Sequence, residues 1–225
     1  MTLYSYCLRY DDGSAPNPYW GVCTLAICKP AIRKVAKKGD WVVGLGSKRS
    51  PVGDKSGQVV YAMKVTKPVL SMAEYDEYCR KDLPEKIPDW RGPDFRRKVG
   101  DCIYDFRHGK RPRLRPSVHS KANRETDLRG ERVLLSGHFY YFGDQPVPLP
   151  KRLLPIVHQT QGHKSHANAE HVDTFVAWIE GRGFRRNAVL GKPQCQAEIM
   201  SRSSLECRGM CSKRHQKDNE QDDIC

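Results

Sequence analysis

The apolar residues of this chain occur in short runs that glycine, proline and polar residues interrupt, and this spacing limits the possible folds most. Runs with the alternation or the β-branched and aromatic content of strands span residues 3–10, 22–28, 40–46, 57–70 and 132–142. Shorter amphipathic patterns predict helices after Pro30, over 71–81, from 151 and over 171–179. The mixture predicts an α+β fold, in which a mixed, mostly antiparallel β-barrel carries short helices at its periphery.

The net charge indicates what kind of partner the chain binds. It carries 39 Lys and Arg against 26 Asp and Glu, a formal net charge of +13. Such an excess favours polyanions, nucleic acid first, although a basic but inert surface is the alternative. Between residues 91 and 132 there are 13 Lys and Arg against 6 Asp and Glu. Segment 82–130 also holds five prolines and few aliphatic residues, so we expect a basic insertion or loop there rather than a packed element.

Composition also bears on location and domain organisation. No window approaches the roughly 20 apolar residues that cross a bilayer, so no membrane contact is expected. The first residues lack the basic and apolar regions of a secretory signal, and nine cysteines are an odd number for a secreted disulfide scaffold. These features predict a cytoplasmic, reducing location. We expect one domain over residues 1–193 and a flexible polar tail over 194–225.

Several motifs follow one another in an order that resembles a known family. They are Asp11-x-Gly13-x-Ala15-Pro16-Asn17-Pro18, Cys23-Thr24-Leu25-Ala26-x-Cys28-Lys29-Pro30, Gly39-Asp40-Trp41-Val42-Val43-Gly44, Ser136-x-His138-Phe139-x-Tyr141-Phe142-Gly143, Gly162-His163-Lys164-Ser165, Phe175-x-x-Trp178-Ile179 and Gly191-Lys192-Pro193. Together, over residues 3 to 193, they resemble the second nucleotide modification associated domain family.

That family is similar to the PUA-like superfamily, which includes the EVE, ASCH and YTH modules. The resemblance implies a PUA-like β-barrel core and an association with DNA base modification systems of phages and bacteria. EVE and YTH modules bind modified bases in a cage, whereas ASCH members bind RNA and some are enzymes. The resemblance therefore leaves both a binding module and an enzyme open.

A module that recognises a modified base needs cations for phosphates, aromatic rings for stacking and polar groups for a base edge. The candidate cations are Arg96, Arg97, Lys98, Arg107, Lys110, Arg111, Arg113 and Arg115. The candidate rings are Tyr19, Trp20, Trp90, Phe139 and Tyr141, and the candidate polar groups are Asn17, Thr24, Lys29, Ser47 and His138. The alternatives are a solvated basic loop, core positions for Trp41 and His138, and an ordinary Asx-turn at Asn17.

The predicted function is recognition of a modified nucleobase in DNA, rather than RNA, through an aromatic-lined pocket with a basic rim. A base inside a duplex has to be extruded before a protein can enclose it. We therefore expect the early proline-rich loop, 11–21, and the late aromatic strand, 132–142, to converge on a cavity. A subunit that packs against partner proteins of a DNA modification or defence system is a simpler possibility.

The alternative function is a nucleobase- or nucleotide-modifying enzyme that uses the same cleft. His138 and Lys29 are candidates, and so is Cys28, because an adjacent cation favours the reactive thiolate, although a buried inert cysteine is more common. Asp11 and Asp40 are a candidate acid–base pair. No phosphate-binding glycine loop is present, and no cofactor is expected.

Two sets of residues have weak metal-ligand spacing. They are Cys207, Cys211 and His215 with Cys195 or Cys225, and the histidines 158, 163, 166 and 171. Because structural zinc ligands usually come from two separate elements, we predict no metal site in either set.

Overall fold

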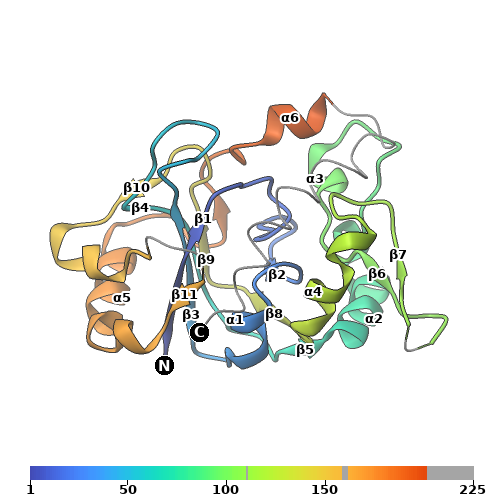
Figure 1. Cartoon of the computed structure of the whole chain (residues 1–225), viewed down its shortest axis with the longest axis horizontal. Coiled ribbons are helices and arrows are strands. Elements are labelled where there is room, and N and C mark those ends of the chain that lie inside the picture. Colours follow the sequence, from blue (N-terminus) through green and yellow to red (C-terminus); the bar gives the residue numbers. More distant parts are fainter. Residues whose placement is uncertain (110, 159–161, 202–225) are drawn as a thin grey trace.

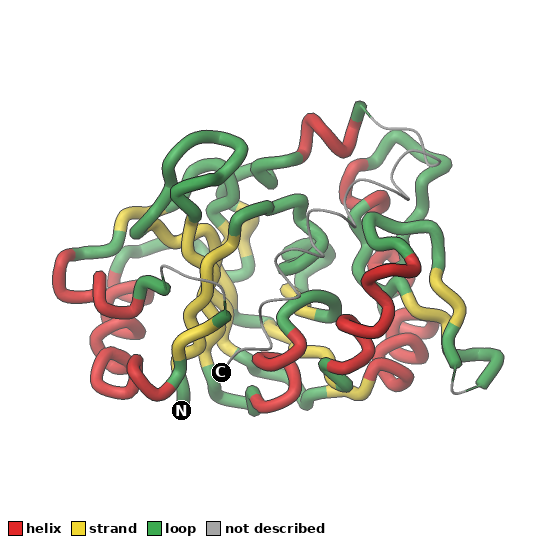
Figure 2. Tube along the Cα trace, in the orientation of Figure 1, coloured by secondary structure: helices red, strands yellow, loops and turns green. Residues whose placement is uncertain are grey.

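The computed structural model describes residues 1–109, 111–158 and 162–201, and one sheet runs through its middle (Figure 1). Its strand order is β11 (His163–Lys164), β1 (Leu3–Leu8), β3 (Trp41–Gly46), β4 (Gln58–Lys64), β9 (Phe139–Tyr141) and β12 (Ala188–Val189), with β10 (Val147–Pro148) also paired to β4. β1 with β3 and β9 with β12 are parallel pairs, and the other neighbours are antiparallel. The fold is thus mixed α/β, with several short helices around a multi-stranded sheet (Figure 2).

The sheet is open, which corrects the prediction of a closed barrel. Within the described ranges, β11 and β12 lie at opposite ends of the strand order and do not pair with each other. The physical reason lies in the continuous apolar run of β3. Trp41 and Val43 belong to the hydrophobic cluster on one face, while Val42 belongs to the cluster on the other. A strand buried on both faces belongs to a middle layer, whereas a barrel strand encloses one core.

Different elements cover the two faces. One face packs against η3 (Lys151–Ile156), η4 (His166–His171) and α5 (Val172–Gly181), through residues such as Leu153, Phe175 and Ile179. The other packs against α1 (Pro30–Val35), α2 (Met72–Asp82) and a three-stranded sheet of β2 (Cys23–Leu25), β8 (Arg132–Ser136) and β5 (Leu70–Ser71). Figure 1 shows α5 on one side of the main sheet and α1 and α2 on the other. α6 (Gln196–Met200) ends the described chain.

Helix α2 begins where the sequence predicts. Ser71 Oγ accepts a hydrogen bond from Glu74 N at 3.2 Å, and Ser71 N donates to Glu74 Oε2 at 2.7 Å. This reciprocal pair is a capping box, and it satisfies two backbone donors at the start of the helix.

Segment 82–130 is packed, contrary to the prediction of an external loop. It contains η1 (Pro84–Lys86), α3 (Phe95–Lys98), β6 (Tyr104–Asp105), β7 (Arg113–Leu114), η2 (Lys121–Asn123) and α4 (Arg124–Arg129). Val99, Ile103 and Val118 are fully buried in the core. The apolar residues stand singly between turns, so no periodic pattern reveals them, and buried polar groups occupy the positions where aliphatic residues would be expected.

Lys86 is the central buried polar group of this segment. Its side chain is fully buried, and Nζ donates to Asn17 O, Asn17 Oδ1, Val22 O and Thr24 Oγ1 at 2.7–2.9 Å. Thr24 Oγ1 in turn donates to Asp101 Oδ2 at 2.5 Å, and the Tyr75 hydroxyl donates to Asp101 Oδ1 at 2.7 Å. This network joins the start of the chain to segment 82–130.

We expect Lys86→Met to destabilise the fold by about 3–5 kcal/mol, because it leaves buried carbonyls and the Asp101 carboxylate without their cation. The measurement is the free energy of unfolding in urea. Lys81→Met is the matched control, since Lys81 is exposed on α2, and its effect should stay within about 0.5 kcal/mol. Equal effects of the two substitutions would show that the network contributes nothing.

Candidate functional site

Two of the polar groups predicted to contact a base are fully buried. Asn17 and Thr24 both belong to the Lys86 network, and Asn17 Nδ2 donates to Val99 O at 2.9 Å. Ser47 is also buried, and its Oγ accepts from Arg49 N at 3.0 Å within a turn. These side chains form hydrogen bonds with other groups of the protein, so they do not belong to the proposed interface.

The early loop and the late aromatic strand meet by direct contact of buried side chains, which corrects the prediction that they enclose a cavity for a base. The Tyr141 hydroxyl donates to both carboxylate oxygens of Asp11, at 2.6 and 2.7 Å, and both side chains are buried. Burial raises the pKa of Asp11 to about 7, although the hydrogen bond from Tyr141 opposes that rise. Phe139 and Tyr141 lie in the core beside one face of the sheet, and Tyr19 is buried against Phe95.

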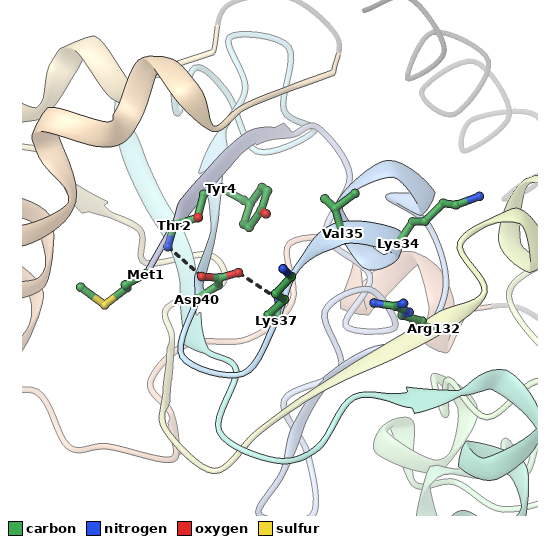
Figure 3. A pocket seen from close by; sticks show the side chains of 8 residues that line it. All are labelled: Met1, Thr2, Tyr4, Lys34, Val35, Lys37, Asp40 and Arg132. Atoms are coloured by element: carbon green, nitrogen blue, oxygen red, sulfur yellow. Dashed lines mark hydrogen bonds between the residues drawn. The ribbon is translucent and has the colours of Figure 1, made fainter.

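The contacts of His138 and Asp40, two candidates for catalysis, indicate that both residues stabilise the fold. The His138 ring lies edge-on to Trp41 and Tyr140, and Nε2 is 3.2 Å from Glu180 Oε1. Burial lowers the pKa of His138, and nearby Arg186 lowers it further. Asp40 accepts from Thr2 N at 2.7 Å and from Lys37 N at 2.9 Å, so its carboxylate holds two backbone segments together (Figure 3).

Several predicted aromatic and cationic residues lie together in pairs. The Arg96 guanidinium lies 4.4 Å from the Trp20 ring centroid, and Lys98 Nζ lies 5.8 Å from that of Trp90. Both indoles are half-buried, and within the described chain their Nε1 donors have no acceptor. Lys29 Nζ is 4.9 Å from the Tyr6 ring.

Half of the predicted cationic track is exposed, namely Arg96, Arg107, Arg111 and Arg113. Lys98 is half-buried. Arg115 is largely buried, and its NH2 donates to Asp76 Oδ1 at 2.6 Å, so it anchors the segment internally. Arg97, half-buried, donates from NH1 to Pro84 O at 3.1 Å. Lys110 lies outside the described residues. Arg111 and Arg113 remain on the surface beside β7, and Arg107, also exposed, pairs with Asp105.

Arg111 and Arg113 line a hollow of about 370 Å³ together with Pro112, Leu114, Lys121 and Arg124, and we call it the basic hollow. Its lining has four cations and no carboxylate. A second hollow, of about 390 Å³, adjoins it and shares Leu114 and Lys121; Arg115, Pro116, Ser117, His119, Ser120 and Ala122 complete its lining. We call it the His119 hollow. Convergent cations without a paired acid suit the oxygens of a phosphate.

A third hollow, of about 600 Å³, lies at the amino-terminal end (Figure 3). Lys34 and Lys37 of the α1 region and Arg132 of β8 lie around it, with Met1, Thr2, Tyr4, Val35 and Asp40. Because α1 packs against α4, cations continue from β7 across α4 to α1. Figure 1 shows these three elements following one another across the molecule.

Comparison with known families gives a direct result. The model of the family described as nucleotide modification associated domain 2 matches residues 1–201. The chain belongs to this family. The predicted resemblance is therefore confirmed, and the family description links the chain to nucleotide modification systems. No curated protein and no solved structure matches it.

In this nucleotide modification associated domain, the sequence alone did not reveal His119. Its Nε2 lies 3.6 Å from Cys28 Sγ, although the two residues are 91 positions apart. Among the described residues, Cys28, His119 and Asp127 form a group of potential metal ligands. Histidines 158, 163, 166 and 171, which have weak metal-ligand spacing in the sequence, form no such group in the described part of the chain. Cys207, Cys211, His215 and Cys225 lie outside the described residues. No helix in the described part of the domain is both long and apolar enough to cross a membrane.

The raised pKa of Asp11 predicts a stability change with pH. Because the folded state binds the proton more tightly than the unfolded chain, this carboxyl destabilises the fold as pH rises from about 4 to about 7. The loss is on the order of 4 kcal/mol at most. Asp11→Asn removes the titration, so the variant should gain stability relative to the natural protein between pH 5 and pH 8. Thermal unfolding at both pH values measures this gain.

Asp173→Asn is the control for that experiment, because Asp173 is exposed on α5. Its difference from the natural protein should be the same at both pH values. If Asp11→Asn behaves in the same way, Asp11 is ionised in the fold throughout this range and the prediction is wrong.

Proposed function

We propose that this domain binds nucleic acid, DNA in preference to RNA, with the phosphate backbone lying along the face formed by β7, α4 and α1. The observation that carries the proposal is the basic hollow, whose four cations converge without a carboxylate in its lining. Phosphate contacts from Lys and Arg supply most of the affinity of such interfaces.

The surrounding charge supports the same face. Further Lys and Arg side chains on or beside these elements are Lys34, Lys37, Lys38, Arg129 and Arg132, all exposed. Two exposed carboxylates belong to the same stretch, Glu125 and Glu131, and Glu131 pairs with Lys34 at 2.7 Å. A field of one sign over a continuous face attracts a polyanion and speeds its association.

We infer further that the bound nucleic acid carries a modified base. The family's link to nucleotide modification supports this, and so do the half-buried rings of Trp20 and Trp90, each beside a cation. An aromatic face stacks on any base, and it is the ring faces rather than the buried indole N–H groups that support this inference. We propose in addition that the domain is related to the PUA-like modules. We also propose that it is located in the cytoplasm and binds partner proteins of a modification system.

Nucleotide modification itself is the second candidate function. Of the residues expected to support catalysis, Cys28 favours it most, because the fold brings a histidine to its sulfur. His138, by contrast, packs among rings at the edge of the core.

The backbone contact is tested with the double variant Arg111→Gln/Arg113→Gln. We expect its affinity for a 20-base-pair duplex to fall roughly ten- to a hundredfold, and the slope of log affinity against log salt to fall by about 2. Fluorescence anisotropy at several salt concentrations measures both quantities. Arg185→Gln/Arg186→Gln is the matched control, since both residues are exposed beyond α5. An equal loss in the control would mean that net charge alone matters.

Base recognition is tested with Trp90→Leu. We expect the preference for a modified duplex over an unmodified one to fall several-fold while the salt slope stays unchanged, because stacking is removed and phosphate contacts remain. Competition binding with duplexes carrying different cytosine and adenine modifications measures the preference. Trp178→Leu replaces a half-buried tryptophan in the other hydrophobic cluster and should leave the preference intact. A natural protein that binds all duplexes equally would contradict base recognition but leave backbone binding in place.

A further inference from the structure

Three buried side chains form a hydrogen-bonded relay beneath the His119 hollow. Cys28 Sγ lies 3.6 Å from His119 Nε2, and His119 Nδ1 lies 2.6 Å from Asp127 Oδ2. All three residues are at most 5% exposed. A sulfur beside a histidine that a carboxylate orients is the arrangement that activates a cysteine nucleophile.

The carboxylate of Asp127 is fixed on every side. Its Oδ1 accepts from Cys28 N at 3.0 Å, and its Oδ2 accepts from the Tyr104 hydroxyl at 3.0 Å in addition to His119. The buried Arg33 donates from NH2 to Asp127 O at 2.5 Å and from Nε to Cys28 O at 2.7 Å. The Asp127 carboxylate and the Arg33 guanidinium therefore fix the positions of Cys28 and His119 relative to each other.

Charge favours the reactive form of the pair. Burial on its own would lower the pKa of His119, but Asp127, Cys28 and their hydrogen bonds outweigh it and raise that pKa to about 10. The Asp127 carboxylate, 2.6 Å from Nδ1, therefore favours the protonated form of His119. A cation next to a thiol favours the thiolate, which is the form that attacks carbon.

The backbone at Cys28 is strained. Cys28 has φ +57° and Lys29 has φ +44°, so two consecutive residues other than glycine adopt the left-handed region. Such strain persists where the surroundings enforce it, and here the bonds from Asp127 and Arg33 hold both backbone groups of Cys28. The fold thus maintains an unfavourable backbone conformation at a cysteine that lies beside the buried His119–Asp127 pair.

The neighbouring hollows indicate the kind of substrate. His119 lines its hollow, and Leu114 and Lys121 are shared with the basic hollow. A phosphate bound among Arg111, Arg113, Lys121 and Arg124 therefore lies next to the space that reaches the histidine.

We propose that Cys28 is a covalent nucleophile and His119 its acid–base partner, and that they act on a nucleotide or nucleic acid whose phosphate occupies the basic hollow. The proposal rests on the phosphate binding proposed above. Cys28 Sγ donates its electron pair to an unsaturated ring carbon of the base, and an S–C bond forms. The π electrons of that carbon move to the adjoining ring atom, which takes the proton from His119 Nε2. The product is a neutral thioether adduct beside a neutral imidazole, and reversal restores both partners.

A metal centre fits the same three residues less well. Both oxygens of Asp127 already accept hydrogen bonds, from Cys28 N, His119 and Tyr104. The three residues offer an ion at most one ligand atom each, whereas structural zinc takes four ligands.

The proposal is tested by alkylation with iodoacetamide in the presence of a phosphine reductant, with the modified cysteines quantified by mass spectrometry. Cys7 is more exposed than Cys28 and serves as a reference within the same molecule. We expect Cys28 to react more than tenfold faster than Cys7 at pH 7. In His119→Gln the Cys28 rate should fall at least tenfold, while the Cys7 rate stays the same.

His166→Gln is the matched control, because His166 is exposed on η4, and it should change neither rate. An unfolded His119→Gln variant would reveal itself by a faster Cys7 reaction. In that case a measurement on the natural protein decides: a saturating oligonucleotide should slow Cys28 alkylation at least fivefold and leave Cys7 unchanged.

Three results would overturn the proposal. They are a Cys28 rate no greater than that of Cys7, no protection by an oligonucleotide that anisotropy shows to be bound, and stoichiometric protection of Cys28 by Zn²⁺ alone, which would make it a metal ligand. Failure of phosphate binding is distinguishable, because it appears in the anisotropy measurement without any change in the alkylation rates of the protein alone.

Discussion

Buried charges from segment 82–130 hold the early part of the chain in place, and the candidate site depends on them. Lys86 binds the backbone around Asn17 and Val22, and Asp127 binds the backbone nitrogen of Cys28. Segment 11–29 contains the short strand β2 and a bridge between Asn17 and Thr24, and bonds to distant residues add to these. Since an unsatisfied buried polar group is costly, each of these bonds strongly disfavours any other placement of the segment. The position of Cys28 therefore follows from residues about a hundred positions later in the chain.

The same arrangement explains why the surface is basic. Of the carboxylates between residues 91 and 132, Asp101, Asp105 and Asp127 are buried and bound to internal partners. Arg111, Arg113 and Lys121 remain outside, where no internal acid lines their hollow. Folding thus separates the two signs of charge, and the exposed face is more basic than the local composition suggests. The polar interior and the basic face proposed to bind phosphate are two consequences of one packing arrangement.

The sequence predicts local features well because local interactions determine them. Ser71 and Glu74 specify the start of α2, and the basic composition of segment 82–130 is visible directly. The sequence does not predict interactions between distant segments. The fold brings His119 to Cys28 over 91 positions, and neither residue has a pattern around it that points to the other. The barrel prediction was wrong for a related reason: the apolar run of β3 does not reveal that the structure divides it between two hydrophobic clusters, one on each face of an open sheet. The sequence predicts that Asn17 and Thr24 contact a base at the surface. Their buried partner Lys86 lies in a segment with few aliphatic residues, so the sequence does not indicate that this segment covers them.

The proposed binding and the proposed chemistry of this domain respond to different physical variables. The cations of the basic hollow are near the surface, and salt at physiological strength screens them over about 8 Å. Cys28 and His119 are buried, so added salt weakens their attraction much less. Salt therefore changes how much nucleic acid is bound while the reactivity of the buried pair remains set by Asp127 and Arg33. A substrate without a phosphate would meet the same nucleophile but would lack the anchor at Arg111 and Arg113. On the proposal above, selectivity for phosphate-bearing substrates then resides in binding, whereas the buried pair of Cys28 and His119 carries the reaction.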